Sequence, residues 1–228
     1  MTLQSWYATL AQSNPDLFRL IHDFNTRPQH WVPPQRLSAL PNANVVGYLS
    51  KAGHSRALLG KWVFNQLGVD PDKASWEFTE PRSRLALLSW EALEALARFS
   101  GAALRWSEIK SIIGKEDIQR LKARLGGDAH LFALQRGPFL RSAANLKTLG
   151  KNAPPLPDQA WLDGWGMVAK ALAGEPLPTI ERFLLKVPKE FRDVYSDNLP
   201  VEVRDGAWGF IRRVAQEVLP ELELRCFA

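Results

Sequence analysis

Residues 24–41 read FNTRPQHWVPPQRLSALP, a proline-rich stretch set between two segments with helical patterns. Each of its four prolines lacks a backbone N–H donor and disfavours helical geometry in the preceding residue. We therefore expect no regular helix to run through this stretch. It still carries large apolar side chains, among them Phe24, Trp31 and Leu37. A loop with this much apolar surface is expected to pack across helices rather than extend into solvent.

The sequence leaves two interpretations of this stretch open. It is either a crossover loop that packs within the protein, or a surface that docks another protein. In the second case we expect the contacts to come from Phe24, Asn25, Arg27, Pro28 and Trp31. The backbone of Arg27 is restricted by the proline that follows, so its guanidinium could be held ready to bind a carboxylate or backbone carbonyls.

Length and cysteine content predict a soluble, cytoplasmic protein. A chain of 228 residues can bury a core without the help of disulfides or a metal. Its single cysteine, Cys226, cannot form a disulfide within the chain, which favours a reducing compartment. The first 15 residues lack the basic start and apolar core of a signal peptide, and no apolar run reaches the length of a membrane span.

Apolar residues recur with helical spacing along most of the chain, which predicts an all-α fold built as a compact multi-helix globule. Asn14-Pro15-Asp16 is a strong helix start, with Asn14 as the cap. Gly101 and Gly114 are expected to end helices. Residues 84–88, RLALL, could form a short strand or an extended lead-in to the next helix, which leaves room for one minor strand pair. Helices are expected over about residues 3–11, 15–24, 55–67, 90–99, 103–113, 115–125, 158–172, 179–186 and 204–219, with another starting at 128.

The best candidate for an internal linker is KNAPPLP at residues 151–157. It divides the chain into a main helical domain at residues 1–150, which includes the proline-rich stretch, and C-terminal helices at residues 151–228. These last helices either complete the same domain or form a small lobe of their own.

The net charge of +5 is concentrated in the middle of the chain. Residues 101–151 hold 10 Lys or Arg against 4 Asp or Glu. Such an excess could face an acidic protein, nucleic acid or an anionic membrane surface. In the helix expected at 115–125, we predict that Lys115, Arg120, Lys122 and Arg124 bind an acidic protein partner. Glu116 precedes Arg120 by four residues, so part of this charge pairs within the helix.

Nucleic-acid binding is the alternative function. Residues 106–125 have the outline of a helix-turn-helix around Gly114. However, Lys110 and Arg120 occupy positions that in such a motif normally carry a small residue and an aliphatic residue. We therefore favour a solvated or protein-docking face over a DNA-reading one.

We find no set of residues that predicts an enzyme, a cofactor or a metal site. Ser107-Glu108-Ile109-Lys110 fits the S-x-x-K element of penicillin-recognising enzymes, and Ser196-Asp197-Asn198 fits their S-D-N element. The K-T-G element that should follow S-D-N is missing. No histidine has a second ligand at the spacing that zinc sites use. No glycine-rich phosphate loop opens a helix.

Two parts of the sequence resemble the SctK family of type III secretion proteins, called YscK in older naming. The first part is Phe24-Asn25-Thr26-Arg27-Pro28 with Trp31 and Pro33-Pro34. The second consists of residues 84–88, Gly101-Ala102, residues 109–118, Leu125-Gly126, Phe132-Ala133-Leu134 and Pro138-Phe139-Leu140, in that order. Together they cover residues 24–140, a little over half of the chain.

This resemblance implies a non-enzymatic, cytoplasmic adaptor of the injectisome's sorting platform. Such proteins link the cytoplasmic domain of the inner-membrane ring protein, SctD, to the pod protein, SctQ. The resemblance implies no cofactor and no small-molecule substrate, and it carries no catalytic residue over to this chain. Contact with the membrane would be indirect, at the cytoplasmic face of the inner membrane.

Overall fold

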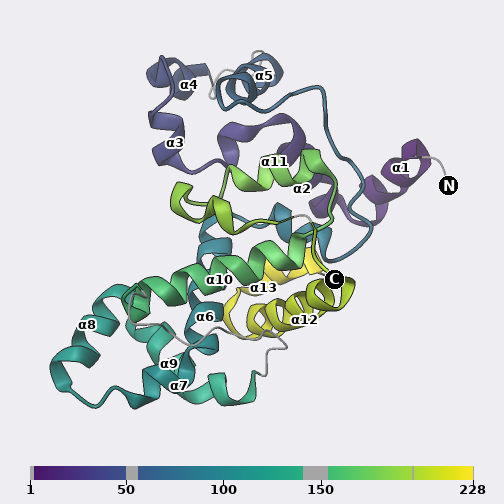
Figure 1. Cartoon of the computed structure of the whole chain (residues 1–228). Helices are drawn as coiled ribbons and strands as arrows, with labels where there is room; N and C mark the ends of the chain where they lie inside the picture. Colours follow the sequence, from purple (N-terminus) through teal and green to yellow (C-terminus); the bar gives the residue numbers. More distant parts are fainter. Residues whose placement is uncertain (1–2, 50–55, 141–153, 197, 228) are drawn as a thin grey trace. The chain divides into compact units, whose positions relative to one another are not determined.

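The computed structural model describes residues 3–49, 56–140, 154–196 and 198–227, and the regular structure in these ranges is helical (Figure 1). Since these ranges contain no strand, the all-α prediction is confirmed and the strand pair is not found. The candidate strand at 84–88 was wrong, because the chain there forms a 3₁₀ helix, η3 (Ser83–Leu87). Leu85, Ala86 and Leu88 are all fully buried, so this apolar run reflects burial on every side rather than one face of a sheet.

The chain divides into two compact units. Unit 1 comprises Met1–Trp90, Glu175–Pro188 and Cys226–Ala228, and unit 2 comprises Glu91–Gly174 and Lys189–Arg225. Each unit therefore takes segments from both sides of residue 150. The expected boundary itself lies in residues 141–153, outside the described ranges, and a separate C-terminal lobe stays a prediction.

Unit 1 begins with the helix start that the sequence predicts. The side chain of Asn14 accepts a hydrogen bond from the backbone N–H of Leu17 at 3.1 Å, and Pro15 is the first helical residue. No continuous helix crosses the proline-rich stretch, although two short helical segments begin at its prolines. Within the described residues, the helices of unit 1 are α1 (Leu3–Ser13), α2 (Pro15–Thr26), η1 (Pro28–His30), α3 (Pro34–Ser38), α4 (Ala43–Leu49), α5 (Arg56–Gln66), η3 and α11 (Leu177–Leu184).

Unit 2 is built around two long helices that lie side by side, α10 (Leu156–Leu172) and α12 (Val201–Val218) (Figure 1). The remaining helices are α6 (Trp90–Leu104), α7 (Trp106–Ser111), α8 (Lys115–Leu125), α9 (Gly127–Arg136), η4 (Gly137–Phe139), η5 (Lys189–Val194) and α13 (Glu221–Leu224). A last turn, η6 (Arg225–Phe227), runs from unit 2 into unit 1.

The expectation that Gly101 ends a helix was wrong, because α6 continues through it to Leu104. A methyl group at Gly101 would overlap the carbonyl oxygen of Ala160 in α10, and one at Gly164 would overlap the carbonyl oxygen of Ala97 in α6. The two glycines therefore serve a close crossing of two helix backbones. This requirement is tertiary, so the local sequence could not distinguish it from a helix end.

Helix α8 has the bounds that the sequence predicts. It starts after Gly114, and it ends at Gly126, whose φ of +96° suits a residue without a side chain. Leu121 and Leu125 face inward and pack with Ala129 and Ala133 of α9. One side of α8 is therefore anchored in the core of unit 2, and the other side faces solvent.

Candidate functional site

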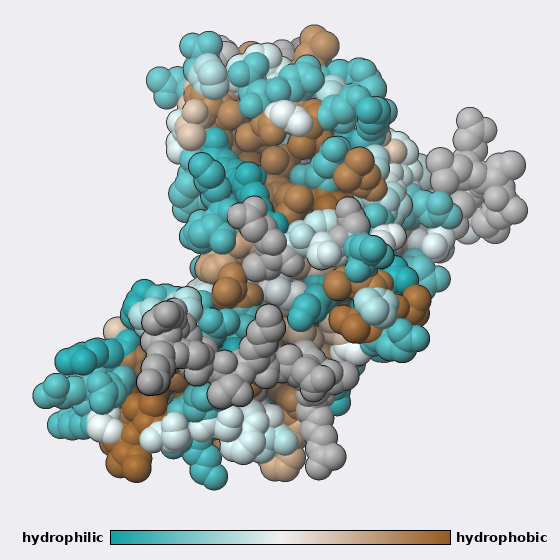
Figure 2. Space-filling model, viewed as in Figure 1, coloured by the Kyte–Doolittle hydropathy of each residue, from teal (hydrophilic) through white to brown (hydrophobic). Residues whose placement is uncertain are grey.

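The four cations predicted to bind a partner, Lys115, Arg120, Lys122 and Arg124, all lie on α8 and are all exposed. The side chain of Arg120 is 74% exposed and that of Arg124 is 54% exposed. Figure 2 shows hydrophilic side chains in teal next to hydrophobic ones in brown over the α8 end of unit 2. The structure thus places all four cations at exposed positions of one helix.

Two of these cations already have partners within unit 2. Arg120 lies 3.5 Å from a carboxylate oxygen of Asp117 and 3.7 Å from one of Glu116. Arg124 donates a hydrogen bond of 2.6 Å to Asp158 in the first turn of α10. All five side chains are at least 40% exposed, and ion pairs at such positions are typically worth less than about 1 kcal/mol.

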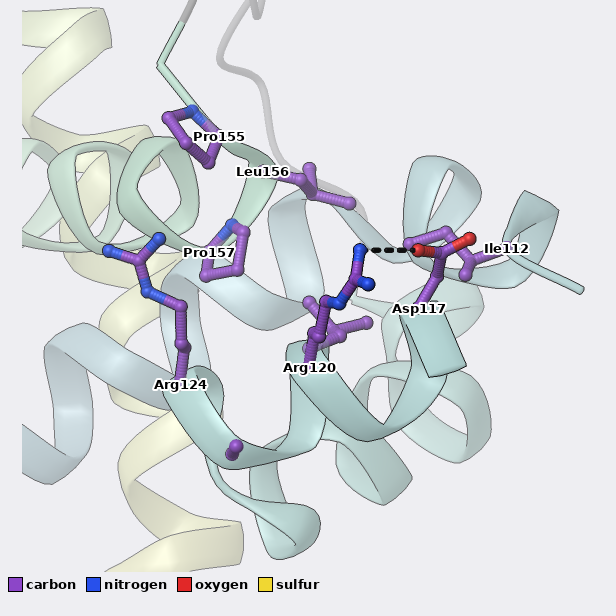
Figure 3. Close-up of a pocket in the computed structure, with 9 residues that line it drawn as sticks. Ile112, Asp117, Arg120, Arg124, Pro155, Leu156 and Pro157 are labelled. Carbon is purple, nitrogen blue, oxygen red and sulfur yellow. Dashed lines mark hydrogen bonds and ion pairs between the residues drawn. The ribbon is translucent and has the colours of Figure 1, made fainter. Parts of the chain in front are cut away.

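A cavity of about 370 Å³ lies between α8 and the start of α10. Figure 3 shows Arg120 and Arg124 projecting from α8 toward Pro155, Leu156 and Pro157. The residues that line the cavity are Ile112, Asp117, Arg120, Leu121, Ala123, Arg124, Pro155, Leu156 and Pro157. Most of them are apolar, and the three charged ones lie on α8.

The sequence pointed to the two arginines of this cavity but not to its opposite wall. Leu156 is an apolar residue between two prolines, in the stretch interpreted as a linker. An apolar residue in a polar, proline-rich linker is a signal of packing, and Leu156 indeed packs against the core beneath α8. What the sequence could not show is that this segment meets α8, more than 30 residues earlier in the chain.

The predicted contact residues in the proline-rich stretch lie mostly inside unit 1. Phe24, Asn25 and Pro28 are buried, whereas Trp31 is half-buried and the side chain of Arg27 is 31% exposed. Arg27 donates a hydrogen bond of 3.1 Å to Asp23 of its own helix. The burial of Phe24, Asn25 and Pro28 favours the interpretation of this stretch as a packed crossover loop. Contacts between a partner and any of the five predicted residues stay a prediction.

Unit 1 contains two buried cations that the sequence gave no reason to single out, Lys186 and Arg182, and the first of them contacts this stretch. Lys186 is 3% exposed, and its Nζ donates hydrogen bonds to the carbonyl oxygens of Ala86 at 2.8 Å and Leu88 at 2.6 Å. The same Nζ lies 5.1 Å from the ring centres of both Phe24 and Trp31, which stack on each other. The aromatic core of the proline-rich stretch is thus built around a lysine.

Arg182, one helical turn before Lys186, is fully buried. It donates hydrogen bonds to the carbonyl oxygens of Lys73 at 2.7 Å and Pro178 at 3.2 Å, and it lies over the ring of Phe64. Burial lowers the pKa of Arg182 below its ordinary value, but an arginine still stays charged near neutral pH. These contacts indicate a structural role in unit 1 rather than one in binding.

The described ranges contain no cluster of three or more His, Cys, Asp or Glu side chains suited to a metal ion. The hydroxyl of Ser107, the serine of the S-x-x-K match, donates to the carboxylate of the adjacent Glu108 at 2.6 Å. Within the ranges that the structure describes, no helix is both long and apolar enough to cross a membrane.

Comparison with protein families finds one match that covers nearly the whole chain. Residues 20–227 match the YscK family, described as YOP proteins translocation protein K. The chain belongs to the YscK family. The match confirms the resemblance read from residues 24–140 and extends it through the last third of the chain. No match was found among curated proteins or among solved structures.

Membership in the YscK family makes this chain a type III secretion-related protein. The family is a component of a secretion system and is not known as an enzyme family.

Proposed function

We propose that this chain is a non-enzymatic adaptor of the type III secretion injectisome. In this role it links the cytoplasmic domain of the inner-membrane ring protein, of the SctD type, to the pod protein, of the SctQ type. The observation that carries the proposal is the YscK match over residues 20–227. The chain would act in the cytoplasm, at the inner face of the membrane, and touch the membrane only through its partners.

The surface of α8 supports this role. Its four exposed cations lie on a helix that Leu121 and Leu125 fix in the core, and Arg120 and Arg124 stand one turn apart on one side of it. A rigid, basic surface suits an acidic protein partner, since complementary charge speeds encounter and fixes orientation. The exposed ion pairs of Arg120 and Arg124 cost little to exchange for the carboxylates of a partner.

Size-exclusion chromatography with light scattering tests the proposal directly. The chain is mixed separately with the pod protein and with the cytoplasmic domain of the ring protein from the same secretion system. We expect it to co-elute with each at physiological salt. The double substitution Arg120→Glu and Arg124→Glu should weaken whichever complex uses α8, while the circular dichroism spectrum stays that of a folded helical protein. If the folded wild-type chain co-elutes with neither protein, the adaptor function is wrong.

A second candidate function is nucleic-acid binding, which the basic excess of residues 101–151 favours. It predicts that the chain co-elutes with a short DNA duplex and that added salt weakens this binding steeply. Co-elution with DNA but with neither protein would establish this alternative.

A further inference from the structure

We propose that the cavity between α8 and the start of α10 binds an acidic segment of a partner protein through one apolar anchor side chain. Carboxylates next to the anchor would pair with Arg120 and Arg124. This inference rests on the docking role proposed above, and it adds the chemistry by which the partner is recognised.

The apolar part of the cavity supplies the site for the anchor. Leu121 is 3% exposed and forms part of the core, and Ile112 and Leu156 pack against that core from the side. Pro155 and Pro157 form the opposite edge. A volume of about 370 Å³ lies near the lower limit for binding sites in proteins, which suits one or two side chains better than a large ligand.

The lining of the cavity holds two arginines against one carboxylate, Asp117, and this excess of positive charge favours an acidic segment. Arg120 and Arg124 stand one helical turn apart, so two carboxylates on either side of a single anchor can reach them. Both guanidinium groups are more than half exposed and keep donors available to solvent beyond their present ion pairs. Lys115 and Lys122 add positive charge on the same helix, which attracts an acidic chain over a longer range.

The same features favour a protein segment over nucleic acid. None of the described residues that line the cavity is aromatic, whereas proteins that bind single strands use aromatic rings as platforms for stacked bases. Proteins that bind duplexes work mainly through phosphate contacts, and a phosphate backbone has no apolar group to place against Leu121 and Leu156. A peptide with an apolar side chain between acidic ones uses both parts of this surface.

The proposal is tested with two synthetic peptides and the full-length chain. The first probe is acetyl-Glu-Asp-Glu-Leu-Glu-Asp-Glu-amide, and the second replaces its leucine with serine. Binding is followed by chemical-shift changes in the amide spectrum of the labelled protein, which detects millimolar affinities. We expect the leucine peptide to shift the amides of α8 and of residues 155–157. The serine peptide should bind at least about tenfold more weakly, since burial of a leucine is worth about 1.5 kcal/mol or more.

Matched variants separate the cavity from its surroundings. Ala123 is exposed and lines the cavity, so Ala123→Trp fills the cavity without altering the core; Gln119→Trp places the same ring on an exposed part of α8 outside the lining. We expect the first variant to weaken binding of the leucine peptide about tenfold, and the second to leave binding unchanged.

The role of charge is tested with two double variants. One combines Arg120→Gln with Arg124→Gln, and the other combines Lys115→Gln with Lys122→Gln.

Both charge variants lose two positive charges from α8, but only the arginines line the cavity. The arginine variant should therefore lose more affinity for the leucine peptide than the lysine variant. The proposal is overturned if the peptides bind equally, if neither binds at millimolar concentration, or if Ala123→Trp binds as the wild type does. Displacement of the leucine peptide by a short DNA duplex would overturn it in favour of nucleic acid. If the pod or ring protein co-elutes while the peptide tests fail, the adaptor function stands and only this inference is lost.

Discussion

The buried cations of unit 1 connect several segments of its interior. Lys186 lies between the stacked rings of Phe24 and Trp31 on one side and the carbonyls of Ala86 and Leu88 on the other. A lysine is seldom buried unless its ammonium group is fully hydrogen-bonded. Here that requirement ties the chain just after α11 to the chain around η3 and to the proline-rich stretch.

We predict that Lys186→Met destabilises the protein by about 2 kcal/mol. Methionine fills a similar volume but cannot donate, so two buried carbonyl oxygens lose a hydrogen-bond partner. Urea unfolding followed by tryptophan fluorescence measures the effect. The control is Lys189→Met, because Lys189 is exposed three residues later, and it should change stability by less than about 0.5 kcal/mol. Equal midpoints for the two variants would show that the contacts of Lys186 contribute nothing.

His130 in α9 gives unit 2 a sensitivity to acid. Its side chain is only 8% exposed; burial, together with the nearby charge of Lys122, lowers the pKa of His130 below its ordinary 6.5. Below pH 6.5 the unfolded chain takes up a proton that the folded protein does not. The contribution of His130 to stability is therefore lost as the pH falls through this range, and it is constant above it.

We predict that His130→Gln reduces the loss of stability between about pH 7 and about pH 5 relative to the wild type. Glutamine does not titrate, so the variant lacks this one proton uptake. Unfolding by urea at each pH gives the slope, and the ring signals of His130 in a proton NMR titration give its pKa directly. An ordinary or raised pKa for His130 in the folded protein would contradict the prediction.

At the scale of helices, the crossing of α6 and α10 is the contact with the least tolerance. Gly101 and Gly164 let the two backbones approach until a methyl group on either would overlap a carbonyl oxygen. We predict that Gly101→Ala and Gly164→Ala each destabilise the protein by about 2 kcal/mol or more, because the helices must move apart. Thermal unfolding followed by circular dichroism measures the loss.

Gly166 provides the matched control on α10. Nothing lies within 4 Å of a methyl group placed there. Gly166→Ala should therefore stabilise the protein by about 0.5–1 kcal/mol, since alanine is the better helix former. If all three variants were stabilised alike, the close crossing would not exist in solution.

Local signals in the sequence were sufficient to predict where many helices start and end. They were insufficient to predict which helices contact each other. Asn14 and Pro15 mark the start of α2 by capping chemistry, and Gly114 and Gly126 enclose α8, so these bounds follow from neighbouring residues alone. Gly101 carries the same local signal as a helix end but serves a helix crossing.

The candidate site shows the same division. The charges of Arg120 and Arg124 were visible in the sequence, because solvent-facing cations on a predicted helix need no tertiary information. The opposite wall at Leu156 and the buried environment of Lys186 depend on which segments meet in space. No pattern within one helix records such meetings, so these features required the structure.

For the molecule as a whole, the proposed adaptor function requires two surfaces that work at the same time. The α8 surface of unit 2 is one candidate, and partner contacts by the proline-rich stretch of unit 1 stay a prediction for the other. An adaptor must hold both partners in one complex, whereas a protein with a single binding surface would exchange one for the other.

The decisive measurement is therefore light scattering, after size-exclusion chromatography, of the chain mixed with the pod protein and the cytoplasmic domain of the ring protein together. We predict a single complex that contains all three proteins, with a mass above that of either two-protein complex. The double variant of Arg120→Gln and Arg124→Gln should lose the partner that α8 binds and keep the other. Two-protein complexes that exclude each other, or no complex with either partner, would contradict the adaptor function.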